Sequence, residues 1–115
     1  MQKTINLDGR EVRVEMTADT LRVYRQVFGL DLIVEMMDVV NSIQNDKPVD
    51  LEIIENLFFI CAAACDPEIT DINEWLRQFS TLSIYMATSE IIDMWIEENK
   101  TIVQRKKKVD LPSEE

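Results

Sequence analysis

The stretch DLEIIENLFFICAAACDP, residues 50–67, decides the fold of this chain. Its nine residues from Leu57 to Cys65 form the longest apolar run in the sequence. Asp50 is a favourable N-cap for a helix, and Pro67 cannot continue a helical hydrogen-bond ladder. Because a helix that is apolar nearly all round is normally buried, we predict that Leu57–Ala64 is the central helix of a bundle.

Two helices are predicted after this central segment. A short one spans Asp71–Phe79, and a longer one begins at Ser80 or Thr81 and ends at about Asn99. The apolar face of the longer helix gathers Ile84, Ile91, Ile92 and Trp95.

Two more helices are predicted before it. Thr17 or Asp19 can cap the first, and Gly29 can end it in the left-handed conformation that glycine tolerates. The second runs from Asp31 to about Gln44. Its carboxylates Asp31, Glu35 and Asp38 form an acidic ridge beside its apolar face. The apolar stripes are Leu21, Tyr24, Val27 and Phe28 in the first helix, and Leu32, Met36, Val39, Val40 and Ile43 in the second.

The chain opens with two alternating segments, Lys3–Leu7 and Glu11–Met16, joined across Asp8-Gly9, a strong hairpin signal. The predicted fold is therefore mainly α, with an N-terminal β-hairpin followed by a compact bundle of about five helices. Residues 1–100 are expected to form a single helical domain, and residues 101–115 a flexible charged tail.

Charge is distributed unevenly along the sequence. Residues 31–98 contain fifteen acidic side chains and only two basic ones, Lys47 and Arg77, whereas both flanks are close to neutral. A negative body repels phosphate backbones and anionic lipids, so we expect no nucleic-acid or membrane partner and instead a protein partner. The apolar run is also far shorter than the ~20 residues that a membrane-spanning helix needs, and the N-terminus lacks a signal-peptide pattern, which predicts a cytoplasmic protein.

Residue types that support catalysis are scarce. The chain has no histidine, which removes the commonest general base and metal ligand, so we expect no enzyme activity, cofactor or metal. Cys61 and Cys65 are four residues apart, but a structural zinc site needs two more Cys or His ligands, and buried free thiols are the favoured interpretation. Ridge carboxylates could in principle bind a hard cation, although solvated helix faces explain them more simply. Ser42 falls near a helix end, where a phosphopantetheine-carrying serine is not expected.

Candidate partner-binding residues come from two sources. Methionines suit adaptable protein surfaces because the thioether is flexible and polarisable, although core filling competes as an explanation. Arginines on the first helix lie at the edge of its stripe or on its far side. The candidates are Met36, Met37, Met86, Trp95, Arg22 and Arg25.

The hairpin followed by TLRVYRQVFGLDL, residues 20–32, resembles the opening of tail assembly chaperones of long-tailed bacteriophages and prophages. The rear half is similar to the C-terminal pattern of the same family. The residues that carry this second likeness are Glu74-Trp75-Leu76, Phe79, Ile91, Met94-Trp95, Asn99, Thr101 and the lysines that end at Lys108. The resemblance covers about residues 2–108, through helix signatures that carry no catalytic chemistry.

This resemblance implies a small, acidic, mostly helical protein of the host cytoplasm that binds the tape measure protein and keeps it soluble until tail tube subunits polymerise around it. It also implies a possible longer, frameshifted form that recruits the tail tube protein, and a possible homo-oligomer. Lys106-Lys107-Lys108 fits such a frameshift, because consecutive lysine codons can form a slippery sequence.

Two alternatives remain open at this point. An acidic protein-binding module, such as a nucleic-acid mimic or inhibitor that occupies a basic groove, would have the same charge. An enzyme that uses ridge carboxylates and a metal would be stabilised by divalent cations. The basic run Arg105–Lys108 could serve as a solubilising tail, contact nucleic acid or fold back on the acidic body.

Overall fold

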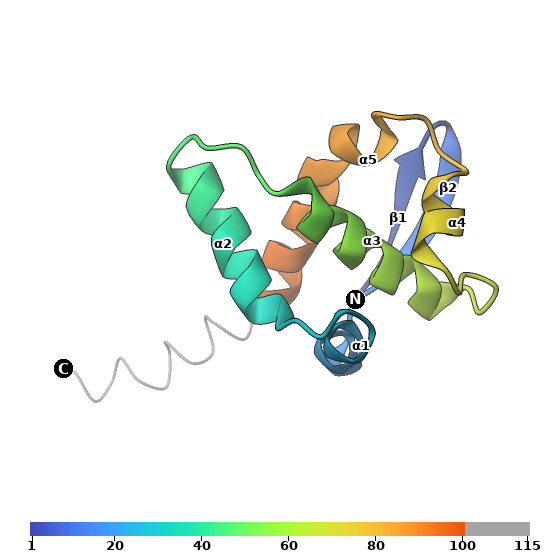
Figure 1. Cartoon of the computed structure of the whole chain (residues 1–115), viewed down its shortest axis with the longest axis horizontal. Helices are drawn as coiled ribbons and strands as arrows, with labels where there is room; N and C mark the ends of the chain where they lie inside the picture. Colours follow the sequence, from blue (N-terminus) through green and yellow to red (C-terminus); the bar gives the residue numbers. More distant parts are fainter. Residues whose placement is uncertain (101–115) are drawn as a thin grey trace.

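The computed structural model describes residues 1–100, which form a mainly helical fold with an N-terminal two-stranded antiparallel hairpin (Figure 1). The strands are β1 (Gln2–Leu7) and β2 (Arg10–Glu15), and the labelled helices are α1 (Ala18–Phe28), α2 (Leu32–Gln44), α3 (Leu51–Cys65), α4 (Ile72–Leu76) and α5 (Ser83–Met86). Residues 88–100 form a further helix behind α3. The predicted tail, residues 101–115, lies outside the described residues.

The hairpin forms at the predicted turn. Asp8 and Gly9 both have positive φ, 57° and 78°, as a type I′ turn requires, and the strands pair in the register Leu7 opposite Arg10 and Ile5 opposite Val12. The alternation places the side chains of Ile5, Leu7 and Val14 in the core.

Helix α3 is the central element, as predicted. Asp50 caps it by accepting a hydrogen bond from the Glu52 amide at 3.0 Å. The helix contacts β2, α1, α2, α4 and α5, and in Figure 1 it runs through the middle of the molecule with these elements around it. Its buried residues are Ile53, Ile54, Asn56, Leu57, Phe58, Phe59, Ile60, Cys61 and Ala62. The hydrophobic core of the described chain is therefore built around α3.

A row of aromatic rings connects α1, α4 and the segment after α4 to α3. Phe28 of α1 lies 6.4 Å from Phe59, which lies 6.2 Å from Trp75 of α4, and Trp75 lies 5.2 Å from Phe79, between ring centroids. The Arg10 guanidinium of the hairpin sits 4.6 Å from the Phe79 ring centroid, in a cation–π contact.

The prediction of one continuous last helix was wrong. The chain makes a turn at residues 80–82 and then forms the short helix α5. The helical conformation is interrupted at Ala87, and a separate helix, residues 88–100, follows. The Thr88 hydroxyl donates a hydrogen bond to the Ile84 carbonyl at 3.0 Å, and such side-chain bonds compete with the backbone ladder and bend helices.

Helix α4 is also shorter than predicted, ending at Leu76 instead of Phe79. Contacts with the hairpin hold the segment that follows. The Asp8 carboxylate accepts hydrogen bonds from the backbone amide and the hydroxyl of Ser80, and Arg10 donates to the Gln78 carbonyl at 2.9 Å. These bonds fix the backbone in a turn and lower the pKa of Asp8, mainly through the Ser80 amide.

Gly29 provides a test of the connection between α1 and α2. It ends α1 with φ 69°, and a Cβ at this position would meet no atom within 4 Å. A side chain there therefore costs only the left-handed backbone strain, about 1–2 kcal/mol. We predict that Gly29→Ala lowers the free energy of unfolding by about that amount in urea titrations, and that Gly29→Asn lowers it less. An alanine variant as stable as the wild type would contradict this origin of the turn.

Candidate functional site

The structure separates the six candidate partner-binding residues. Met36 is only 1% exposed and packs in the core, so the prediction that it contacts a partner needs correction. It occupies the same buried face of α2 as Leu32 and Val39. Trp95 is half-buried and packs against the core, whereas Arg22 and Arg25 are exposed on α1.

Met37 and Met86 are both strongly exposed, at 66% and 73%, but they belong to different surfaces. Met37 lies on the outer side of α2 with Ile33 and Val34, away from the face that packs on α3. Met86 lies at the end of α5 and lines a largely apolar hollow.

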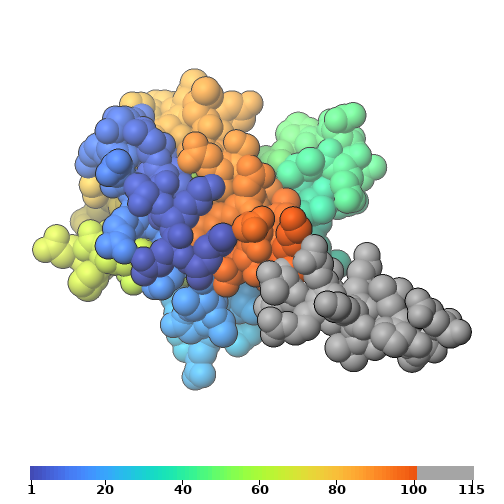
Figure 2. All heavy atoms as spheres, turned by 180° about the vertical axis from the view of Figure 1, so that it is seen from behind, coloured from blue at the N-terminus to red at the C-terminus, as the bar shows by residue number. Residues whose placement is uncertain are grey.

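This hollow, which we call the apolar groove, has a volume of about 790 Å³. It lies between the end of α2, the loop that follows α2, the start of α3, α5 and helix 88–100. Figure 2 views the molecule from behind and shows α2 with its following loop, in green, beside the orange helix. The apolar residues that line it are Ile43, Pro48, Val49, Leu51, Tyr85, Met86, Ile92 and Ile96.

The groove exists because two apolar stripes extend past the core. Ile43 continues the core-facing stripe of α2 by one more turn, yet it is 47% exposed, so the helices and strands of residues 1–100 leave it largely uncovered. Helix 88–100 carries two stripes: Ile91 and Met94 are buried in the core, while Ser89, Ile92, Asp93 and Ile96 face the groove. The spacing of these four is that of one helical face, with Ile92 nearly buried and Ile96 50% exposed.

Acidic residues occur in and next to the segments that line the groove. Asp93 lines it, Asp50 lies between the lining residues Val49 and Leu51, and Glu97 follows Ile96. All three carboxylates belong to exposed residues. Lys47 is the only basic residue in the two segments that supply the walls, 43–51 and 85–96.

A cluster of carboxylates between α2 and the start of α3 adds to this negative field. Partial burial, and then the charges of Asp50, Asp38 and Glu52, raise the pKa of Glu35. Burial, and then Glu52 and Asp50, likewise raise the pKa of Glu55. Within residues 1–100 the only ion pair joins the Met1 amino group to Glu98 at 3.4 Å, so this cluster has no basic partner there.

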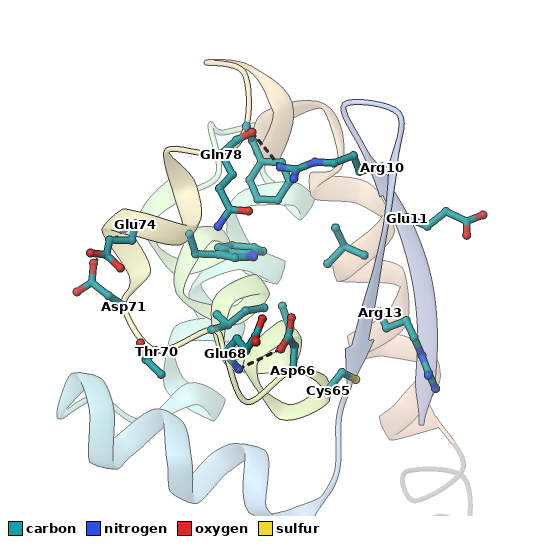
Figure 3. Close-up of a pocket in the computed structure, with 15 residues that line it drawn as sticks. Arg10, Glu11, Arg13, Cys65, Asp66, Glu68, Thr70, Asp71, Glu74 and Gln78 are labelled. Carbon is teal, nitrogen blue, oxygen red and sulfur yellow. Dashed lines mark hydrogen bonds between the residues drawn. The ribbon is translucent and has the colours of Figure 1, made fainter.

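A second hollow, of about 510 Å³, separates the hairpin from α4 (Figure 3). Several of its polar groups already make hydrogen bonds that stabilise the fold. Arg10 binds the Gln78 carbonyl, Asp71 caps α4 by accepting from the Glu74 amide at 2.9 Å, and Asp66 accepts from the Glu68 amide at 3.0 Å. We therefore regard this hollow as a structural junction.

The cysteines are free, as predicted. Cys61 is buried, and desolvation raises its pKa to about 12, which keeps the thiol protonated. Cys65 is half-buried, and burial raises its pKa as well. Within residues 1–100, no three Cys, Asp or Glu side chains are grouped so as to hold a metal ion.

Sequence reasoning missed most of the groove. Ile43 was assigned to a core stripe but is exposed, Ile92 was correctly assigned to the core face but also lines the groove, and Tyr85 and Ile96 were not considered. One signal was available: Ile96 lies off the predicted apolar face of its helix, with a spacing of four from Ile92. The remaining lining residues meet only through the tertiary fold.

The comparisons with known proteins give no relative: no protein-family model, curated protein or solved structure matches this chain. None of the helices within residues 1–100 combines the length and the apolarity needed to span a bilayer.

The raised pKa of Glu35 allows a test of how the unpaired carboxylate cluster affects stability. A raised pKa means that the folded protein binds this proton more tightly than the unfolded chain, so stability falls as pH rises from the ordinary glutamate value of about 4.3 through the raised one. We predict that Glu35→Gln raises the melting temperature at pH 7, and that the gain shrinks at about pH 4. Glu68→Gln, at an exposed loop position, is the control. A gain equal at both pH values would contradict the electrostatic cause.

Proposed function

We propose that this protein is a tail assembly chaperone of a long-tailed bacteriophage or prophage. It binds the tape measure protein in the host cytoplasm and keeps it soluble while the tail tube assembles. The observation that carries the proposal is the open apolar groove in a strongly acidic body. The sequence resemblance described above supplies the identity of the client.

The groove supports this role through its chemistry. Exposed apolar surface that gathers in one place is typical of protein-binding sites, and here eight apolar residues line a single hollow. A client segment that buries its apolar side chains against these walls is withdrawn from contact with other copies of itself. The contact hides surface without changing any bond, so the proposed activity is binding and not catalysis.

The acidic surface supports the second half of the role. The whole chain carries a net charge of −10, and the described body carries most of the acidic residues. Like charges keep complexes apart and therefore soluble. A chaperone that covers a long apolar client with negatively charged copies gives the whole assembly the same repulsion.

Two further parts of the proposal concern other partners. A longer, frameshifted product would recruit the tail tube protein, and the lysine codons that would permit it, at residues 106–108, lie outside the described residues. A homo-oligomer would let several copies cover one long client.

The carboxylate cluster around Glu35 favours one competing function, that of a nucleic-acid mimic or inhibitor. Such a protein holds acidic groups in fixed positions and binds a basic groove in a strongly salt-dependent way. It has no need for an apolar groove, which is why the chaperone role is the better supported of the two.

We predict that co-expression raises the soluble yield of the tape measure protein encoded beside this chain, and that Ile96→Glu removes most of the gain. A charge in the groove wall opposes burial of an apolar client, while position 96 is exposed enough for the variant to fold. Soluble yield is measured by centrifugation and densitometry, with folding checked by circular dichroism.

An unchanged yield with the wild-type chain would contradict the chaperone role. Retention of the chain on a basic nucleic-acid-binding protein, lost with salt and insensitive to Ile96→Glu, would favour the mimic instead.

A further inference from the structure

The walls of the apolar groove determine which backbone conformation an occupant can have. They come from α2, α3, α5 and helix 88–100, together with Pro48 and Val49 of one loop, and neither strand contributes. The helices in the walls use their backbone N–H and C=O groups in their own hydrogen bonds. They therefore offer no sheet edge with which an extended peptide could pair. An occupant in an apolar hollow must therefore satisfy its own backbone hydrogen bonds, and an α-helix does so.

The spacing of the wall residues fits such an occupant. Ser89, Ile92, Asp93 and Ile96 form one face of helix 88–100, while Ile43 and Leu51 are the lining residues that come from α2 and α3. A guest helix lying between these walls buries one stripe of apolar side chains against them. Its two flanks then face the rim of the groove.

The rim is negative. Asp93 lines the groove, Asp50 lies in the chain between the lining residues Val49 and Leu51, Glu97 follows Ile96, and Lys47 is the only basic residue in the wall segments. None of the three carboxylates is in an ion pair within residues 1–100. Basic side chains on the guest's flanks would complement them, whereas acidic ones would be repelled.

We propose that the apolar groove binds an amphipathic α-helix whose apolar stripe is flanked by lysine and arginine. Assigning that helix to the tape measure protein rests on the proposed function. The recognition of a basic amphipathic helix is argued from the groove alone. Apolar contacts in the groove supply most of the affinity, and the acidic rim selects the charge of the guest.

The test uses the full-length chain and two fluorescent synthetic helices that share one leucine and alanine stripe. One carries lysine at the flanking positions, and the other carries glutamate. Fluorescence anisotropy should show that the lysine helix binds at least about tenfold more tightly at low salt, and that added salt reduces the difference. Equal binding of both helices would overturn the charge selection.

Two methionines provide a matched pair of variants. Met86→Glu places a charge in the groove, while Met37→Glu places the same charge at a similarly exposed position outside it. We expect Met86→Glu to weaken binding of the lysine helix by about tenfold or more and Met37→Glu to leave it nearly unchanged. Asp93→Asn should weaken it by about threefold, as expected for an exposed charge. Equal effects of the two methionine variants would overturn the groove as the binding site.

These outcomes are separable from those of the co-expression experiment. A chain that solubilises the tape measure protein but does not discriminate between the helices keeps the proposed function and loses this inference. A chain that selects the lysine helix through Met86 but leaves the tape measure protein insoluble keeps this inference and loses the proposed client.

Discussion

Burial of α3 on every side is the constraint on which the rest of the structure depends. Nine of its residues are buried, so the helix needs cover from all directions, and the hairpin, α1, α2, α4 and α5 each contact it. These elements are short, and α2 covers α3 with only part of its length. The stripe of α2 therefore extends past the core to Ile43, and the uncovered apolar surface at that end becomes the groove.

Local signals predicted much of the fold. Asp8-Gly9 identified the hairpin, Asp50 the start of α3, and Gly29 the end of α1, because each acts through bonds or dihedral angles of its own neighbourhood. The end of α4 depends instead on Asp8 and Arg10, which lie about seventy residues away in sequence, and so could not be predicted from the segment itself. The groove was missed for the same reason, since two segments far apart in the sequence, 43–51 and 85–96, build it. Met36 was proposed as a partner contact although it lies on the predicted apolar stripe of its helix, and the fold buries it.

The acidic imbalance and the groove are two parts of one arrangement. Partial burial, and then the carboxylates crowded around it, raise the pKa of Glu35, which means that the folded protein holds this charged group at some cost to its stability. No basic side chain within residues 1–100 pairs with them, although Lys and Arg are present on the hairpin and α1. A basic partner that binds beside the groove would relieve this repulsion, so binding and electrostatic relief are coupled.

Methyl NMR of the full-length chain, titrated with an apolar helical segment of the tape measure protein, tests most directly whether the groove is the binding site for this proposed client. The isoleucine and methionine methyl groups report on both exposed apolar surfaces at once. Binding in the groove predicts that the signals of Ile43, Met86 and Ile96 shift while those of Ile33 and Met37 stay in place. Shifts confined to Ile33 and Met37 would place the client on the outer face of α2 and contradict the role assigned to the groove.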